Sequence, residues 1–296
     1  MTTVSAILPT YNRAATLARA LASVFEQARV PDEVLVVDDG STDDTAAVVR
    51  RFEGARLVRL DRNLGAAGAR NEGIRRSSGE LIAFLDSDDL WLPAKLERQL
   101  AHFAAAPTTQ LLCTGITVHE RSGRAADHIA AGPSSTAGWS FADFQAYPFC
   151  PTTWLIRRDV IEQAGLFDAS LRNCEDLDFL ARIAGRRIHL LPQVLAIKFN
   201  RHDSLDAALE RTVESHRTLF SRHRRLWART PAAAARSHRR LANMHIDAQA
   251  MAAARGALLR GLGYRPWDLR SWAMLAASIF GPRGVTALRR LGMRAP

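Results

Sequence analysis

The 296-residue chain has few cysteines, only two lysines and no long hydrophobic run. Its three cysteines, at positions 113, 150 and 174, are too few and too scattered for a disulfide framework or a cysteine metal site. The longest late uncharged segment, 271–282, has twelve residues, against about 18 to 20 for a membrane span. The N-terminus has no basic segment before its first apolar run, so we expect no signal peptide and a cytoplasmic protein.

Glycine-rich phosphate-binding loops are also missing, because neither the Walker A pattern nor GxGxxG occurs. A nucleotide diphosphate bound by this chain would therefore need a divalent metal ion and basic side chains in place of such a loop.

The net charge of +10 is unevenly distributed. Residues 1–200 carry 22 basic and 24 acidic side chains, whereas residues 201–296 carry 18 arginines and six acids. This asymmetry predicts an anionic partner for the last third: a membrane surface, a nucleic acid or an acidic substrate. Genomic base composition is a second explanation, since arginines outnumber lysines 38 to 2.

The first hundred residues alternate between strand and helix patterns. Short apolar runs predict strands, and apolar residues at helical spacing predict helices; the strands are 4–8, 33–37, 56–60 and 81–85, and the helices 14–27, 45–52, 66–77 and 92–105. This order predicts a parallel sheet covered by helices on both faces. Further along, we expect strands at 111–119 and 188–197, helices at 160–165 and 176–184, a loop at 123–138, and helices after 206. The chain thus divides into an α/β domain, 1–204, and a basic helical extension, 205–296.

Acidic residues follow two of the predicted strands. Asp38 and Asp39 come after the second, and the segment Asp86-Ser-Asp-Asp89 comes after the fourth. Ligands of open α/β sheets bind outside the carboxyl ends of the strands, and an Asp-x-Asp there suits Mg²⁺ or Mn²⁺ with phosphate oxygens. The alternatives are a turn and helix cap for the first pair and a solvated loop for the second segment.

Five ordered segments resemble the motifs of the family-2 glycosyltransferases. They are PTYNR at 9–13, VDDGST at 37–42, N-x-G at 63–65 with ARN at 69–71, LDSDD at 85–89 and CED at 174–176. The resemblance covers about residues 4–205. It implies the GT-A fold, which has a Rossmann-like, mostly parallel sheet, and an inverting transfer from a nucleotide-diphosphate sugar. It also implies a class of donor, the UDP-sugars, and the need for Mn²⁺ or Mg²⁺.

The resemblance implies roles for the residues of these motifs. Donor contacts fall to Pro9, Thr10 and Tyr11 around the base and ribose, Asp39 on the uracil edge, Arg70 near the base or diphosphate, and Asp86 on the ribose. For Arg70 the alternative is a surface arginine.

The metal ligands implied are Asp88 and, in a late segment that resembles the family's closing segment, His202. An ordinary exposed histidine is the alternative for His202. Asp89 either supports the site or caps the following helix, and we favour the cap.

The pair Glu175 and Asp176 carries the acid–base chemistry implied by the resemblance. An inverting transfer is a single displacement, so a carboxylate must take the proton of the acceptor hydroxyl as the anomeric carbon is attacked. Asp176 matches the family's base, and Glu175 orients the site or the acceptor. A helix N-terminal acidic pair is a compatible interpretation. Trp154 stacks on a sugar or belongs to the core, and Cys150 and Cys174 have no expected role.

Two other functions remain as alternatives. A metal-dependent nucleotidyltransferase would show a glycine-rich basic loop after the first strand, where this chain has PTYNR. A nucleic-acid-binding protein would interleave aromatic side chains with its arginines, which the extension does not, so no nucleic-acid partner is expected.

The expected partners are a nucleotide-sugar donor and a glycan, glycolipid or other hydroxyl acceptor, as in cell-surface polysaccharide assembly. In the extension, Trp267 and Trp272 lie beside Arg270 and Arg283 around a short apolar run, which is typical of a helix lying in a membrane interface. We therefore expect peripheral contact with the inner face of the membrane. Packing of that helix against the catalytic domain is the alternative.

Overall fold

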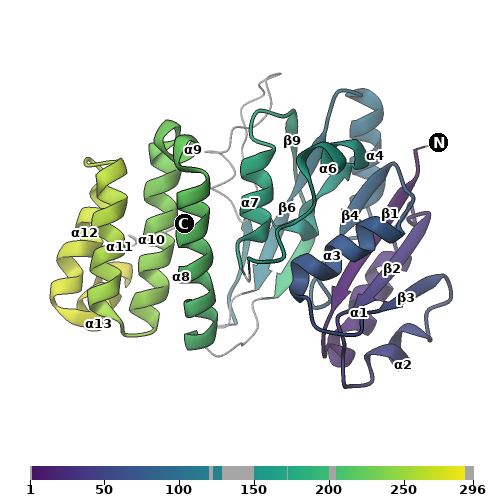
Figure 1. The fold of residues 1–296 in the computed structure, drawn as a ribbon, viewed down its shortest axis with the longest axis horizontal. Coiled ribbons are helices and arrows are strands. Elements are labelled where there is room, and N and C mark those ends of the chain that lie inside the picture. The colour runs from purple at the N-terminus through teal and green to yellow at the C-terminus, as the bar shows by residue number, and fades with distance from the viewer. Residues whose placement is uncertain (1, 120–122, 129–149, 172, 200–204, 291–296) are drawn as a thin grey trace. The chain divides into compact units, whose positions relative to one another are not determined.

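The computed structural model in Figure 1 describes residues 2–119, 123–128, 150–171, 173–199 and 205–290. These residues form two compact units, the sheet unit, which runs to Phe199, and the helical unit, which begins at Leu205.

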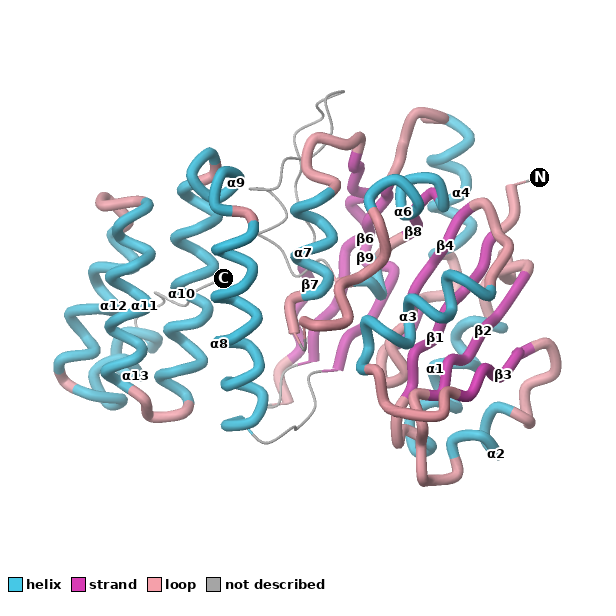
Figure 2. Tube along the Cα trace, in the orientation of Figure 1, coloured by secondary structure: helices cyan, strands magenta, loops and turns pink. Residues whose placement is uncertain are grey.

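The described part of the sheet unit contains one mixed sheet in the order β3-β2-β1-β4-β8-β6-β9-β5, with β7 beside β6 (Figure 2). Its strands are β1 Val4–Thr10, β2 Glu33–Asp38, β3 Ala55–Arg59, β4 Leu81–Phe84, β5 Leu90–Trp91, β6 Leu111–His119, β7 Ala125–His128, β8 Leu155–Arg157 and β9 Ile188–Phe199. Strands β1 to β4 pair in parallel, as does β6 with β9, whereas β8 is antiparallel to both β4 and β6.

Helices cover both faces of this sheet. They are α1 Ala14–Phe25, α2 Thr45–Val49, α3 Gly65–Arg76, α4 Lys95–Ala105, α6 Arg158–Ala164 and α7 Glu175–Arg182, with a 3₁₀ turn at Pro151–Thr153. Successive strand residues point to opposite faces. In β1, Ala6 and Leu8 therefore join the core formed with α1, whereas Ile7 faces α3. There Gly73 allows a close approach, because a Cβ at this position would lie 2.4 Å from Ile7.

The observed architecture confirms the predicted α/β fold class, with three differences in detail. The short strands β5 and β8 were not predicted, and β7 lies inside the predicted loop 123–138, whose residues 129–138 fall outside the described chain. Strands of two or three residues carry too little periodicity to be recognised, and the partners that hold them are distant in sequence.

The helical unit confirms the prediction of helices after 206 for the described residues, which end at 290. Its helices are α8 Leu205–Arg222, α9 Arg224–Arg229, α10 Pro231–Asp247, α11 Met251–Tyr264, α12 Leu269–Ile279 and α13 Gly281–Arg290. A core with Leu241, Leu258 and Met274 joins α10, α11 and α12. Among the described residues, no helix combines the length and the hydropathy needed to cross a membrane.

Candidate active site

The carboxyl ends of β1 and β4 lie side by side, and the sequence order of the strands reverses between them. In open α/β sheets such a reversal produces a crevice at that edge, where ligands bind. The loops after β1, β2 and β4 carry Tyr11, Asp39, Asp86 and Asp88, which are half of the predicted donor and metal residues, and the fold directs these four to the same edge of the sheet.

Hydrogen bonds link the loops after β1 and β2. Asn12 has a φ of 51°, in the left-handed region that asparagine tolerates better than most residues. Its backbone N–H donates to Ser41 Oγ at 2.9 Å, and its side-chain oxygen accepts from the Thr42 N–H at 2.8 Å. Asp38 accepts from the Ser41 N–H at 2.8 Å, which is the turn function that the sequence left open for this residue.

The predicted base-binding residues surround the end of β1. Pro9 and Thr10 are buried in the strand, and Tyr11, immediately after it, is 45% exposed. The buried Thr10 hydroxyl has no hydrogen-bond partner among the described residues. The exposed Tyr11 ring provides a surface on which a base could stack at this edge.

Asp39 is buried against the first turn of α3. Its two carboxylate oxygens accept hydrogen bonds from the backbone N–H groups of Leu64 and Gly65, at 2.7 and 2.8 Å. The first N–H groups of a helix have no partner within the helix and carry partial positive charge, so this carboxylate stabilises the start of α3. The predicted contact of Asp39 with a uracil stays a prediction.

Arg70 joins two acidic segments that are far apart in sequence. From α3, its Nη2 donates to Asp86 Oδ1 at 2.6 Å and its Nη1 to Glu175 Oε1 at 2.7 Å. The residue is 3% exposed, so it is not the surface arginine of the alternative interpretation. Burial opposes its charge, but the two carboxylates outweigh burial and raise the pKa of Arg70 above its ordinary value. A permanent cation therefore connects the loop after β4 to the start of α7.

Asp86 also faces Lys198, near the end of β9. The Lys198 Nζ lies 3.6 Å from Asp86 Oδ2 and 3.4 Å from Asp89 Oδ2. Burial alone would raise the pKa of Asp86, but the charges of Arg70 and Lys198 hold it below the usual range. Asp86 is therefore ionised at neutral pH.

Asp89 does not cap the following helix, contrary to the favoured prediction. Helix α4 begins at Lys95, and Asp89 is fully buried, accepting hydrogen bonds from the Thr152 hydroxyl at 2.7 Å and the Phe199 N–H at 3.1 Å. Burial raises its pKa to about 7, although the Lys198 charge acts in the opposite direction. Asp89 thus supports the acidic loop by linking it to the segment before β8 and to the end of β9.

Asp88 is the carboxylate of this loop whose charge is least compensated. Its side chain is 20% exposed, and the Arg13 Nε lies 4.0 Å from the Asp88 Oδ2. Burial and the neighbouring Asp86 charge raise the pKa of Asp88. A hard divalent cation would offset this charge, so the residue suits the metal-binding role.

The described residues contain no group of three or more His, Cys, Asp or Glu side chains placed to hold a metal ion. The predicted second ligand, His202, lies outside the described residues, as does the whole 200–204 segment.

The predicted base lies at the start of α7. Cys174, the residue before this helix, has a φ of 62°, a left-handed conformation that is uncommon for a non-glycine residue. Glu175 and Asp176 then occupy the first helical turn. Burial and the Glu175 charge raise the pKa of Asp176 to about 6. A general base is most effective when its pKa is close to the working pH, so Asp176 suits proton acceptance near neutrality.

Trp154 belongs to the core, the second of the two interpretations considered. It is fully buried, with its ring centroid 6.3 Å from that of Phe167 and 5.9 Å from that of Phe179. Burial raises the pKa of the Cys150 thiol to about 12, so this cysteine stays protonated.

The sequence interpretation missed Lys198 and Thr152, both of which contact the acidic loop. A weak signal existed for the first, because Lys198 is one of two lysines in a chain with 38 arginines. Thr152 gave none.

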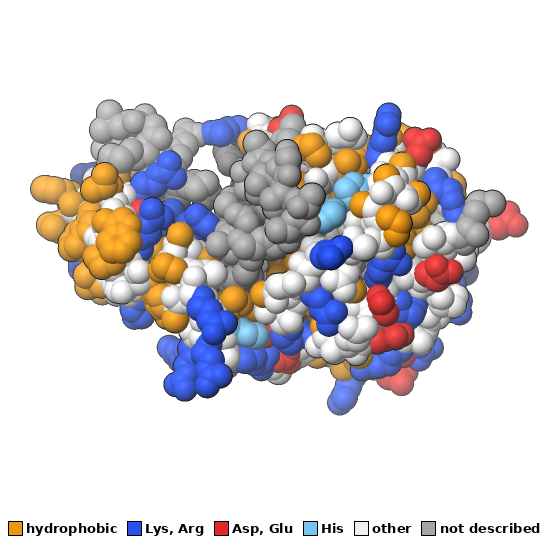
Figure 3. All heavy atoms as spheres, turned by 90° about the horizontal axis from the view of Figure 1, so that it is seen from above, with side chains coloured by type: hydrophobic (Ala, Val, Ile, Leu, Met, Phe, Trp, Pro, Cys, Tyr) orange, Lys and Arg blue, Asp and Glu red, His pale blue; other side chains and the backbone are white. Residues whose placement is uncertain are grey.

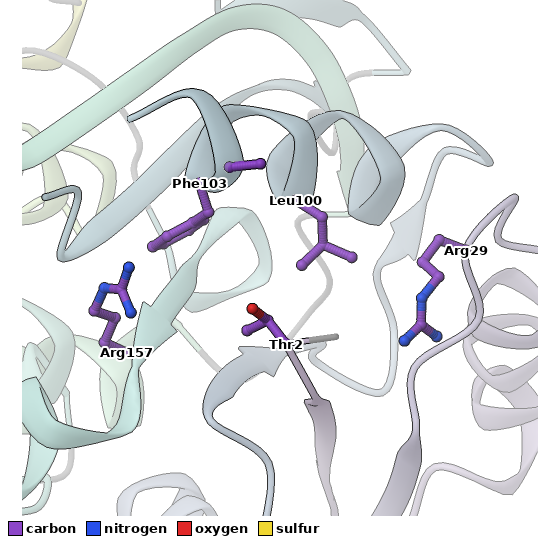
Figure 4. Close-up of a pocket in the computed structure, with 6 residues that line it drawn as sticks. Thr2, Arg29, Leu100, Phe103 and Arg157 are labelled. Carbon is purple, nitrogen blue, oxygen red and sulfur yellow. The ribbon is translucent and has the colours of Figure 1, made fainter. Parts of the chain in front are cut away.

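A cavity elsewhere in the sheet unit is lined by Thr2, Arg29, Leu100, Phe103, Ala104 and Arg157 (Figure 4). Thr2 precedes β1, so this cavity lies near the amino end of that strand, whereas the candidate active site lies at its carboxyl end.

Solved structures with the same architecture are glycosyltransferases of the GT-A fold. The mannosyltransferase PcManGT of Pyrobaculum calidifontis, solved with GDP-Man and Mn²⁺, matches 95% of this chain and 86% of its own, with a TM-score of 0.62 and 22% identity. S. aureus TarS 1–349 in complex with UDP-GlcNAc matches 95% of this chain and 88% of its own, with a TM-score of 0.60 and 18% identity. At these identities the likeness establishes the fold alone.

The chain belongs to glycosyl transferase family 2, whose sequence profile matches residues 5–165. A curated relative is UDP-Glc:alpha-D-GlcNAc-diphosphoundecaprenol beta-1,3-glucosyltransferase WfgD of Escherichia coli, 44% identical over 100 residues, 33% of this chain and 40% of that protein. Another is the succinoglycan biosynthesis protein ExoO of Rhizobium meliloti, 42% identical over 123 residues, 41% of this chain and 35% of that protein. The matches thus span half or less of these relatives' own length.

Proposed function

We propose that this glycosyltransferase moves a sugar from a UDP-sugar to a hydroxyl of a lipid-linked glycan, with inversion, in the assembly of a cell-surface polysaccharide. Residues 1–204 would form the catalytic domain and residues 205–296 an extension that keeps the enzyme at the inner face of the membrane. The observation that carries the proposal is the Arg70 bridge, because one buried cation contacts both the Asp86 loop and the Glu175 segment beside the candidate base.

Donor binding is assigned to the loops at the carboxyl edge of the sheet. Tyr11 and Thr10 would contact the base, and Asp86, held ionised by Arg70 and Lys198, would accept hydrogen bonds from the ribose hydroxyls. The UDP-GlcNAc complex of TarS and the UDP-Glc donor in the name of WfgD support a uridine nucleotide.

A divalent ion, Mn²⁺ or Mg²⁺, fits the oxygen ligands of this loop. Asp88 would hold it, since its carboxylate is the least compensated, and His202 is retained as a proposed second ligand. When bound, such an ion neutralises charge on the diphosphate leaving group.

The transfer itself requires a base and an aligned acceptor. Asp176 would take the proton from the acceptor hydroxyl while that oxygen attacks the anomeric carbon and the diphosphate leaves from the opposite face. Arg70 fixes the Glu175 carboxylate at 2.7 Å, and Glu175 in turn raises the pKa of Asp176. Glu175 would thus keep its neighbour basic enough to accept a proton.

The testing experiment is a donor panel. Purified protein is incubated with several UDP-sugars and GDP-mannose, with Mn²⁺ or EDTA, and with a lipid-diphosphate-linked sugar as acceptor; nucleotide release and product linkage are measured. We expect metal-dependent release of UDP and a product of inverted anomeric configuration. Retention of configuration, or release from GDP-mannose alone, would reject the corresponding part of the proposal.

A further inference from the structure

Helix α12 packs Met274, with Leu275 and Ala277, against the helical core, and it also exposes other large apolar side chains. Its buried residues are Ser271, Met274 and Ser278, whereas Leu269 is 80% exposed and Ile279 71% exposed. A surface helix of a globular protein normally keeps its large apolar residues toward the core. This helix therefore presents an apolar face that the helical unit itself does not cover.

The residues beside α12 extend this face. Eight large hydrophobic side chains are exposed in the described chain, and six of them lie between positions 259 and 280. We call five of these the apolar patch: Trp267, Leu269, Trp272, Ile279 and Phe280. The Trp272 Nε1 donates to the Pro266 carbonyl at 2.6 Å, which links the start of the patch to its middle. Figure 3 shows hydrophobic side chains gathered on the helical unit with arginines among them.

The charge around the apolar patch has one sign. Between 251 and 290 the chain has seven arginines and one acid, Asp268. Asp268 accepts hydrogen bonds from Arg239 at 2.5 Å and from the Ser271 hydroxyl at 2.6 Å, so its charge is engaged within the unit. Arg270 and Arg283, close to the patch in sequence, are exposed. Basic residues near an anionic lipid surface strengthen binding.

We propose that the apolar patch docks the protein on an anionic membrane surface, with α12 lying in the lipid interface. This inference rests on the proposed function for its purpose, because a lipid-linked acceptor would be reached from that surface. Tryptophans gather at the level of the lipid headgroups, and short helices with an apolar face and basic flanks lie in that plane.

Charge disfavours the other occupants of this surface. In a symmetric dimer the patch of one copy would meet the same patch of the other, bringing like charges together. Residues 1–200 carry 22 basic and 24 acidic side chains, so the sheet unit offers little net attraction. An anionic lipid surface satisfies both the apolar and the basic component.

The test uses the full chain and vesicles of phosphatidylcholine with or without phosphatidylglycerol, followed by flotation and by tryptophan emission. We expect binding to the anionic vesicles with a blue shift, and at least tenfold weaker binding for Ile279→Ser/Phe280→Ser. Arg270→Gln/Arg283→Gln should bind the anionic vesicles more weakly, and its remaining binding should depend less on salt. Matched controls are Val30→Ser, at an exposed apolar residue of the sheet unit, and Arg50→Gln/Arg51→Gln, at two exposed arginines directly after α2; both should bind as wild type.

Several outcomes would overturn the inference. They are absence of binding at low salt, equal binding to neutral vesicles, and a dimer in solution that Ile279→Ser/Phe280→Ser dissociates. UDP release without vesicles, measured on the same variants, should equal that of wild type. Vesicle binding without UDP release would refute the proposed function but support the docking surface. UDP release without vesicle binding would support the proposed function but refute the docking surface.

Discussion

Replacing Arg70 with methionine tests the bridge on which the site depends. The arginine side chain is 4% exposed and contacts Asp86 and Glu175 at 2.6 and 2.7 Å. Removing one partner of a buried ion pair costs about 3 to 5 kcal/mol, because the remaining charge stays buried without compensation. For a chain of this size, roughly 2 to 4 °C per kcal/mol gives a Tm lower by roughly 6 to 20 °C. The affinity for UDP should fall as well, since Asp86 loses its orienting partner.

The loss of stability in Arg70→Met should depend on pH in a defined direction. In wild type the pKa of Asp86 is lowered, so its contribution to stability is present above the unfolded value and is lost only as the pH falls through the folded value. In Arg70→Met only Lys198 remains to oppose the effect of burial on Asp86, so the pKa of Asp86 rises relative to wild type and the variant gains relative stability as the pH falls. The difference in Tm from wild type should therefore be smaller near pH 5 than at pH 8.

Arg239→Met is the matched control, because Arg239 is similarly buried and pairs with Asp268 in the helical unit. It should lower the Tm while leaving UDP affinity, measured by calorimetry, close to wild type. Arg70→Lys should recover only part of either property, since an ammonium cannot reach two carboxylates in a fork. Wild-type stability and affinity in Arg70→Met would refute the reasoning.

Four further predictions concern the acids and Lys198. Asp176→Asn should keep donor affinity by calorimetry and reduce transfer by about 10²- to 10⁴-fold, whereas Asp159→Asn, in the first turn of α6, should transfer normally. In wild type, kcat/KM should rise with pH through about 6, because Asp176 must lose its proton to act. Asp88→Asn should weaken UDP binding in the presence of Mn²⁺ but not in EDTA. Lys198→Met should lower the Tm more at pH 8 than at pH 6, because the pKa of buried Asp89, about 7 in wild type, rises without the ammonium.

Each of these has an outcome that contradicts it. Normal transfer by Asp176→Asn would show that the base lies elsewhere. If Glu175→Gln were inactive at the same time, Glu175 would be the base and Asp176 the orienting residue. A pH-independent rate would separate catalysis from Asp176, and full activity in excess EDTA would remove Asp88 from metal binding. A Tm deficit of Lys198→Met that is equal at both pH values would show that Asp89 does not respond to the ammonium.

The first four strands and their helices were predictable because their patterns are local. Helix α1, expected at 14–27, is Ala14–Phe25, and β6 has the bounds expected for it, 111–119. In α1 the apolar residues whose spacing identifies the helix are also the ones that face the core, because Leu17, Leu21 and Val24 all belong to that core.

The contacts of the site were less predictable because they are long-range. Arg70 and Glu175 are 105 positions apart, and the partners of Asp89 at Thr152 and Phe199 are 63 and 110 positions away. The local pattern after β4 resembles a loop that leads into a helix, so a helix cap was the natural expectation for Asp89. Only the folded sheet, which brings the end of β9 and the segment before β8 to this loop, reverses that expectation.

The most direct test of the central claim is transfer by the purified chain from a UDP-sugar to a lipid-linked acceptor, measured for wild type and Asp176→Asn with Mn²⁺ and with EDTA. The account predicts UDP release coupled to product of inverted configuration for wild type with metal, and donor binding with severely reduced transfer for Asp176→Asn. Transfer by Asp176→Asn equal to that of wild type, or wild-type turnover unaffected by EDTA, would contradict it.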